Sequence, residues 1–215
     1  MTEITTPQPA QPDRRLILAV RTELVRQRIA HDGFHPAEHE QIIDMLEHAE
    51  PLFAQRSGLE ENEACLQPIP YIVLKSGDRY VSYVRTDKGG ESRLHGRVSI
   101  GLGGHVDLAD AATSEQGFEL EFTLADGALR ELSEEVSQDS VGDPIWRGVL
   151  VDTSSAVSRV HLGLVAVYEL TDDELPASAE EEIDRVQLMT LEELRDCGDR
   201  LETWSSMLLN WLAEQ

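Results

Sequence analysis

The sequence predicts a mixed α/β sandwich, an α+β domain in which helices cover a mixed β-sheet. Runs of β-branched and aromatic residues, mostly joined by short turns, lie before and after one amphipathic helix in the middle of the chain. The 215 residues, 40% of them hydrophobic, suffice for one sizeable core with elaborations. We therefore expect one main domain.

The N-terminal third is predicted to be an addition to that domain. Residues 1–13 are rich in Thr, Pro and Gln and are expected to form a disordered tail. Residues 14–67 are expected to be an elaboration packed on the core. Within them, 14–27 read as a strand with a short helix as the alternative, and 35–53 read as a helix with Pro36 in its first turn.

Residues 68–215 carry the pattern of the main domain. Residues 69–86 contain two strand-like runs joined by Ser-Gly-Asp, which indicates a hairpin. Residues 97–107 read as a strand that runs into a glycine-rich turn. After the central helix we expect three strands, an acidic loop before the last of them, and two helices; the strands fall in 144–154, 157–170 and 185–190, and the helices in 191–197 and 202–215.

The charge balance restricts the partners. Acidic residues outnumber basic ones 41 to 18, which gives a formal net charge of -23. The resulting field repels polyanions, so duplex nucleic acid and anionic membranes are not expected as partners. A ligand that carries phosphate would need a bridging cation.

The cysteines and the hydropathy pattern indicate a cytoplasmic location. Cys65 and Cys197 lie far apart and form no metal-ligand spacing, so free thiols are expected. The N-terminus lacks the apolar segment of a signal peptide, and no apolar run is long enough to span a bilayer.

The central helix carries an unusual concentration of acid. In "ALRELSEEV", residues 128–136, Glu131, Glu134 and Glu135 stand at i, i+3 and i+4, so their carboxylates are expected on one side of the helix. Like charges so placed repel one another. The helix is otherwise well specified by a candidate N-cap, Thr123 or Asp126, and by an opposite apolar stripe of Ala125, Leu129, Leu132 and Val136.

A glycine-rich segment precedes this helix. "GLGGHVD", residues 101–107, lets the backbone come close to another group, such as a phosphate. A hard divalent cation such as Mg²⁺ binds several carboxylate oxygens and could neutralise the glutamates while it holds a diphosphate. A merely solvated acidic face is the alternative.

These residues resemble the box of the Nudix hydrolase family, G-x5-E-x7-R-E-U-x-E-E-x-G-U, where U is bulky and aliphatic. The segment from Arg130 to Glu135 matches its second half without a miss, and Gly104 fits the leading glycine in a Gly-Gly-His-Val context. The resemblance covers roughly residues 68–215 and implies a Nudix-type α/β/α sandwich. The N-terminal region and the long loop resemble a branch of predicted phosphoesterases.

The box departs from the pattern in two places. The first acidic position falls on Asp110, an aspartate where glutamate is usual, and 19 residues instead of seven separate it from Arg130. Because of this insertion, Glu119 or Glu121 could serve as the displaced acid, and the insertion at 108–126 could be either a lid or a surface feature. The glycine expected after the last glutamate is absent, since the chain continues as Val-Ser-Gln.

The resemblance implies roles for the matched residues. Glu131, Glu134 and Glu135, with Gly104, would hold Mg²⁺ or Mn²⁺, and Arg130 would form an ion pair that orients a glutamate. Gly103, Gly104 and His105 would contact the substrate. The implied reaction is hydrolysis of the diphosphate linkage in a nucleoside diphosphate linked to a variable group X.

The general base has more than one candidate. These are a residue in the acidic run 180–182, represented by Glu181, and a glutamate of the helix; the run is also typical of a solvated loop. His105 could contact phosphate or stiffen the glycine turn by a hydrogen bond.

The sequence also allows an alternative function, and it contains a zinc-like motif and two tryptophans in the last helix. The alternative function is a non-catalytic Nudix domain that senses a nucleotide or binds a protein, and a homodimer is possible through the N-terminal region. "HPAEH", residues 35–39, matches an H-x-x-E-H zinc pattern, but Pro36 and the lack of a third ligand argue against it. Trp204 and Trp211 are expected in core or dimer contacts.

Overall fold

The computed structural model describes residues 13–86, 96–137, 144–170, 177–178 and 183–215. The elements run in the order β1 (Leu16–Arg21), α1 (Thr22–Arg28), β2 (Gly33–Pro36), α2 (His39–His48), β3 (Leu52–Gln55), α3 (Arg56–Leu59), β4 (Cys65–Ser76), β5 (Arg79–Arg85), β6 (Val98–Ser99), β7 (Gly101–Leu102), η2 (Leu108–Asp110), β8 (Ala112–Ser114), β9 (Gly117–Glu119), α4 (Leu120–Glu135), β10 (Val136–Ser137), β11 (Trp146–Val151), η3 (Ser158–Val160), β12 (His161–Glu169), β13 (Ala177–Ser178), β14 (Ile183–Thr190), α5 (Leu191–Asp196), η4 (Gly198–Arg200) and α6 (Thr203–Leu212).

A mixed sheet forms the centre of the molecule. Its main order is β14-β5-β4-β12-β11-β2, with β6 and β7 paired to β5 and β4. The pair β4–β12 is parallel and extends over nine residue pairs, whereas the other pairs are antiparallel. The long hairpin of β4 and β5 is the one that the Ser-Gly-Asp signal predicts. Residues N-terminal to β4 also join the sheet, since β1 pairs with β4 and β2 pairs with β11.

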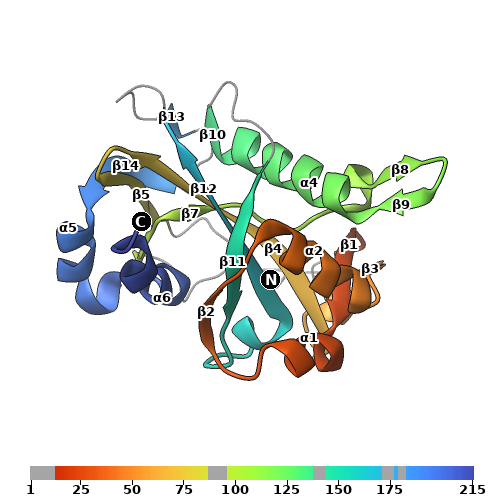
Figure 1. Cartoon of the computed structure of the whole chain (residues 1–215). Helices are drawn as coiled ribbons and strands as arrows, with labels where there is room; N and C mark the ends of the chain where they lie inside the picture. Colours follow the sequence, from red (N-terminus) through yellow and green to blue (C-terminus); the bar gives the residue numbers. More distant parts are fainter. Residues whose placement is uncertain (1–12, 87–95, 138–143, 171–176, 179–182) are drawn as a thin grey trace, which may run out of the picture.

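Helices cover both faces of this sheet (Figure 1). Alternate residues of β4 point to opposite sides: Ile72 and Leu74 pack with α2 and α4, while Tyr71 and Val73 pack with α5 and α6. This alternation is the one expected of a strand buried on both faces. The predicted α/β/α sandwich with a mixed sheet is confirmed.

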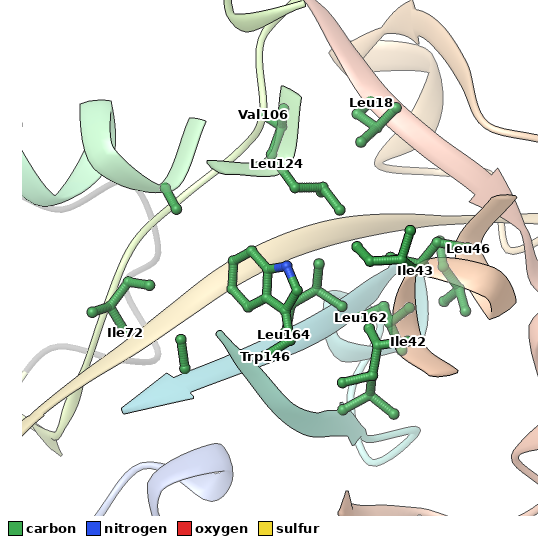
Figure 2. Close-up of a cluster of buried hydrophobic side chains, with 14 of the residues drawn as sticks. Leu18, Ile42, Ile43, Leu46, Ile72, Val106, Leu124, Trp146, Leu162 and Leu164 are labelled. Atoms are coloured by element: carbon green, nitrogen blue, oxygen red, sulfur yellow. The ribbon is translucent and has the colours of Figure 1, made fainter. Parts of the chain in front are cut away.

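The core on the α2 and α4 side is built around Trp146, at the start of β11. Figure 2 shows its indole ring lying between Leu124 of α4 and the side chains of α2, with Leu162 and Leu164 of β12 beneath it. Trp146 is 1% exposed and Leu124 is fully buried. Because burial of one such side chain stabilises by roughly 1.5–3 kcal/mol, this packing fixes the position of α4 on the sheet.

The N-terminal region differs in detail from the prediction. Residues 14–27 contain both alternatives in succession, the strand β1 and then the helix α1. Pro36 ends strand β2 and does not lie in the first turn of α2, which begins at His39 after Glu38 as capping residue. The prediction for Pro36 was wrong because β2 pairs with β11 and extends the chain up to the proline.

The insertion in the box forms structure of its own. Strands β8 and β9 make a short hairpin, and α4 begins directly after it at Leu120. Neither Thr123 nor Asp126 is therefore an N-cap; the Thr123 hydroxyl instead donates to the Glu119 carbonyl and accepts from the Ala112 N–H. The hairpin is exposed on the surface (Figure 1). Among the described helices, none is both long and apolar enough to cross a membrane.

Candidate functional site

The three glutamates of α4 lie in three different environments. The carboxylate of Glu134 is 49% exposed, that of Glu131 is 17% exposed, and Glu135 is buried at 6%. The three nevertheless lie together, because Arg130 bonds to Glu131 and Glu134, while Gly103 and Gly104 contact Glu135 and Glu131. Of the predicted apolar stripe, Ala125 and Leu132 are buried and Leu129 is half-buried, and the helix ends at Glu135, before Val136. Leu124 and Ala128 are buried as well. We call Glu131, Glu134 and Glu135 the acidic face.

The glycine turn, Gly103 to His105, follows β7 and lies against the acidic face. The Gly103 N–H donates to the Glu135 carboxylate at 2.6 Å. Gly103 has a φ of 140°, which favours glycine, and a Cβ there would overlap the Pro70 carbonyl. At Gly104 a Cβ would overlap the carboxylate of Glu131. Gly104 can therefore touch Glu131 only because it has no side chain, while Gly103 reaches Glu135 through its backbone N–H.

Arg130 ties the acidic face to the glycine turn. Its Nε and one terminal nitrogen hold both oxygens of Asp110, at 2.8 and 2.9 Å, and that nitrogen also donates to the His105 carbonyl at 2.8 Å. The other terminal nitrogen donates to Glu131 at 2.8 Å and to Glu134 at 3.1 Å. A guanidinium has five N–H groups, so every donor of Arg130 is used.

Asp110 occupies the position that the sequence left open among three acids. It is buried, receives the two-pronged contact from Arg130, and accepts from the Asp107 N–H at 2.8 Å. Glu119 instead accepts from the Ser114 hydroxyl within the hairpin, and Glu121 pairs with His39 at 3.0 Å. Neither of these glutamates contacts Arg130, so Asp110 is the acid that fixes the arginine.

The electrostatics of the site follow from burial. Desolvation raises the pKa of Glu131 above its ordinary value, although the hydrogen bond and the charge of Arg130 oppose the shift. The hydrogen bond from Arg130 to Asp110 leads the causes that raise the pKa of the arginine. Three carboxylates, those of Asp110, Glu131 and Glu134, thus bond to one guanidinium, and this excess of negative charge attracts a cation.

The donor set fits a hard divalent ion. Every side chain that the acidic face offers is a carboxylate, and the partly desolvated Glu131 lies against the bare backbone of Gly104. Oxygen ligands of this type are those that Mg²⁺ and Mn²⁺ prefer. The residues present therefore suit the ion that the box implies.

His105 and His161 meet on the other side of the glycine turn. Their Nε2 atoms lie 3.2 Å apart, and His161 Nδ1 lies 2.8 Å from the Val157 carbonyl. Desolvation, and then the charge of Arg56, lower the pKa of His105 to about 2. His105 therefore keeps a neutral ring at physiological pH. The contact with His161 was not predicted, since 56 residues separate the two.

The structure brings together most of the predicted site residues. Arg130, the acidic face and the glycine turn form one continuous cluster. The candidate base Glu181 lies outside the described residues.

The histidines of "HPAEH" and the tryptophans of α6 make contacts within the fold. His35 Nε2 lies 2.8 Å from the His31 carbonyl, and His39 contacts Glu121 and the Trp146 N–H, so "HPAEH" does not gather around a metal. The two tryptophans pack within the molecule, Trp204 against Tyr71 and Trp211 against Phe34.

Comparison with known proteins agrees with this geometry. No protein-family model matches the chain. The chain is 28% identical over 207 residues to Protein YmaB of Bacillus subtilis (strain 168), a match that covers 93% of this chain and 98% of that protein. Among solved structures, Tm1382, a candidate Nudix hydrolase, superposes with a TM-score of 0.72 at 27% identity and covers 93% of this chain and 98% of its own.

The chain has the Nudix hydrolase fold.

More distant structures share the Nudix fold alone. A NUDIX hydrolase from Nitrosomonas europaea has a TM-score of 0.50 at 13% identity, covering 69% of this chain and 88% of its own. A bifunctional NMN adenylyltransferase/ADP ribose pyrophosphatase from Francisella tularensis, complexed with AMP and a Mn ion, has a TM-score of 0.51 at 16% identity. That match covers 69% of this chain and 41% of the larger protein. The resemblance to the Nudix family is confirmed.

Proposed function

We propose that the chain is a divalent-cation-dependent Nudix hydrolase that cleaves the diphosphate linkage of a nucleoside diphosphate derivative. The observation that carries the proposal is the network of Arg130, which uses all five donors to hold Asp110 and two glutamates of the acidic face against the glycine turn. One guanidinium neutralises only part of this negative charge, and the remaining repulsion among the carboxylates is relieved when a cation binds.

Glu131, Glu134 and Glu135 would hold Mg²⁺ or Mn²⁺, with the backbone of Gly104 alongside. When bound, the ion would supply Lewis-acid activation of water and would neutralise the charge of the diphosphate. Arg130 positions Glu131 and Glu134 through its hydrogen bonds, and the Gly103 N–H positions Glu135. His105 carries a neutral imidazole beside these residues, and its backbone carbonyl accepts a hydrogen bond from Arg130.

Substrate class rests on the comparisons and on charge. The Francisella tularensis protein with the same fold is complexed with AMP and a Mn ion, which supports a nucleotide derivative here. The net charge of -23 disfavours a polyanionic substrate such as duplex nucleic acid. The general base, with Glu181 as a candidate, the possible homodimer and the cytoplasmic location remain parts of the proposal.

The decisive experiment measures turnover of a panel of nucleoside diphosphate derivatives with and without Mg²⁺. We compare the natural chain with Glu135→Gln and with the control Glu121→Gln, which makes the same change on the same helix in a residue that pairs with His39. Glu135→Gln is expected to lower kcat by at least about 100-fold, an effect typical of lost charge at a catalytic centre. Its amide oxygen can still accept from Gly103, so circular dichroism should be unchanged.

Each result decides between the two functions. Cation-dependent turnover that Glu135→Gln abolishes and Glu121→Gln preserves supports the hydrolase. An absence of turnover over the whole panel, despite Mg²⁺ binding, favours a non-catalytic Nudix domain that senses a nucleotide or binds a protein. Full activity of Glu135→Gln would overturn the assignment of the acidic face.

A further inference from the structure

Three metal-ligating side chains meet beside the glycine turn, although they come from distant parts of the sequence. Glu60 follows α3, His105 ends the glycine turn, and His161 is the first residue of β12. One ligand atom from each lies within 4.8 Å of the other two. None of the three belongs to the acidic face. We call them the histidine cluster.

The contact between the two imidazoles constrains their protons. The Val157 carbonyl can only accept, so the proton of a neutral His161 is on Nδ1, and its Nε2 carries a lone pair. This lone pair faces His105 Nε2 at 3.2 Å. Either His105 donates a hydrogen bond across that distance, or a cation to one side of the line between the two nitrogens binds both of them.

The separation suits a shared cation. Two nitrogens on a tetrahedral Zn²⁺, each at a bond length of about 2.0–2.1 Å, lie about 3.3 Å apart. The observed distance of 3.2 Å between the two Nε2 atoms is close to this value. The bond from His161 Nδ1 to the Val157 carbonyl is also the kind of outer contact that orients a metal-binding histidine.

Glu60 supplies the third ligand. Arg56 donates to its Oε1 at 3.0 Å, which holds the half-buried carboxylate toward the two rings. Arg56 is in turn near Asp13, at 3.6 Å, so its positive charge is shared between two acids. A rotation of the long glutamate side chain suffices to shorten the remaining distance to the imidazoles.

Ligand chemistry separates the two regions. Two imidazoles and one carboxylate suit borderline cations such as Zn²⁺, and three protein ligands leave a fourth position for water. The acidic face offers oxygen alone and suits Mg²⁺. We propose that Glu60, His105 and His161 form a second metal site that binds Zn²⁺ or a related transition-metal ion and joins the N-terminal region to the glycine turn and β12.

The test uses the full chain after treatment with a chelator. Zn²⁺ affinity is measured by competition with a chromophoric chelator, and Co²⁺ is titrated as a spectroscopic substitute whose visible absorption reports tetrahedral nitrogen and oxygen ligation. We expect one equivalent to bind. His161→Gln should lower the affinity at least about 100-fold, because loss of an outer-shell contact already costs about 10–100-fold.

Two further variants make the result specific. Glu60→Gln leaves both imidazoles in place and should lower Zn²⁺ affinity about tenfold or more. The control His48→Gln removes an exposed histidine of α2 that bonds to Asp44, and should bind Zn²⁺ as the natural chain does. Bound Zn²⁺ should also raise the Tm of the natural chain and of His48→Gln, but much less that of Glu60→Gln.

The outcomes are independent of hydrolysis. Glu135→Gln should retain Zn²⁺ binding, so loss of turnover in that variant and loss of Zn²⁺ in His161→Gln identify separate sites. The proposal is overturned if the natural chain binds no Zn²⁺, or if both His161→Gln and Glu60→Gln bind it unchanged. If His161→Gln does not fold, Glu60→Gln decides alone. If the proposal is overturned, a neutral N–H···N hydrogen bond between the two imidazoles fully explains their contact.

Discussion

The acidic face and the histidine cluster adjoin the same glycine turn, yet they are assembled in opposite ways. The acidic face comes from one turn of α4, so its residues are neighbours in sequence as well as in space. The histidine cluster joins Glu60, His105 and His161, which only the packing of β1, β3 and α3 against the sheet brings together. The acidic face can be recognised as a sequence motif, whereas the histidine cluster is visible only in the folded structure.

The contrast also extends to how each region is held. The acidic face depends on charge: Arg130 neutralises part of it and every donor is occupied. The histidine cluster depends on two imidazoles in contact: the Val157 carbonyl fixes His161, and burial lowers the pKa of His105 to about 2. Substitutions should therefore act on one region and leave the other intact, except at residues of the turn that both share.

The largest effect is expected from Arg130→Ala. This change leaves Asp110, whose side chain is 6% exposed, as a buried charge without its partner. Loss of one partner from such a pair costs about 3–5 kcal/mol in the free energy of unfolding, which denaturant titration measures. The matched control Arg159→Ala breaks an exposed pair with Glu63 and should cost about 1 kcal/mol or less. Equal losses in the free energy of unfolding for the two variants would contradict the central structural role of Arg130.

An intermediate effect is expected from Gly104→Ala. A methyl group there overlaps the carboxylate of Glu131, so the glutamate or the turn must move. Because a displacement of about 1 Å at a catalytic centre costs on the order of 100-fold in rate, we expect that loss in kcat with the fold preserved. Gly58→Ala is the control, since nothing lies within 4 Å of its Cβ. Undiminished turnover in Gly104→Ala would show that close contact with the turn is unnecessary.

The smallest effect concerns pH and the histidine cluster. The pKa of His105 is about 2 in the folded chain and about 6.5 when unfolded, so the unfolded chain binds the extra proton as pH falls between these values. His105 therefore lowers the free energy of unfolding below about pH 6.5, with a slope of at most about 1.4 kcal/mol per pH unit. Metal-free His105→Gln should lose less stability than the natural chain between about pH 7 and pH 5 in denaturant titrations. Identical slopes would contradict a neutral, desolvated ring.

Much of the fold is predictable because its strands have clear patterns. The alternation of apolar residues and the turn residues correctly indicate the positions of the β4–β5 hairpin, of strands β11, β12 and β14, and of helices α5 and α6. Pro36 and the start of α4 were misjudged because pairing between distant strands and a hairpin inside the box override local signals. Local sequence reports neither event.

For the site, the spacing of Arg130 and the glutamates predicts a cluster, but not the burial of each member. Glu135 is buried where its carboxylate accepts from the Gly103 N–H, a contact that depends on how α4 lies against the sheet. The choice of Asp110 over two glutamates required knowledge of where the inserted hairpin goes. His161 left a faint signal, a histidine at the head of an otherwise apolar strand.

The saturation of Arg130 has a further implication for recognition. All five N–H hydrogens of Arg130 are already in hydrogen bonds. Arg130 can therefore donate to a phosphoryl oxygen of a ligand only after one of its bonds to a carboxylate breaks. Discrimination among ligands must accordingly originate elsewhere, for example in the cation that we propose the glutamates bind. The Arg130 guanidinium therefore has a structural role, and substitutions that change ligand specificity are expected at neighbouring residues and not at Arg130 itself.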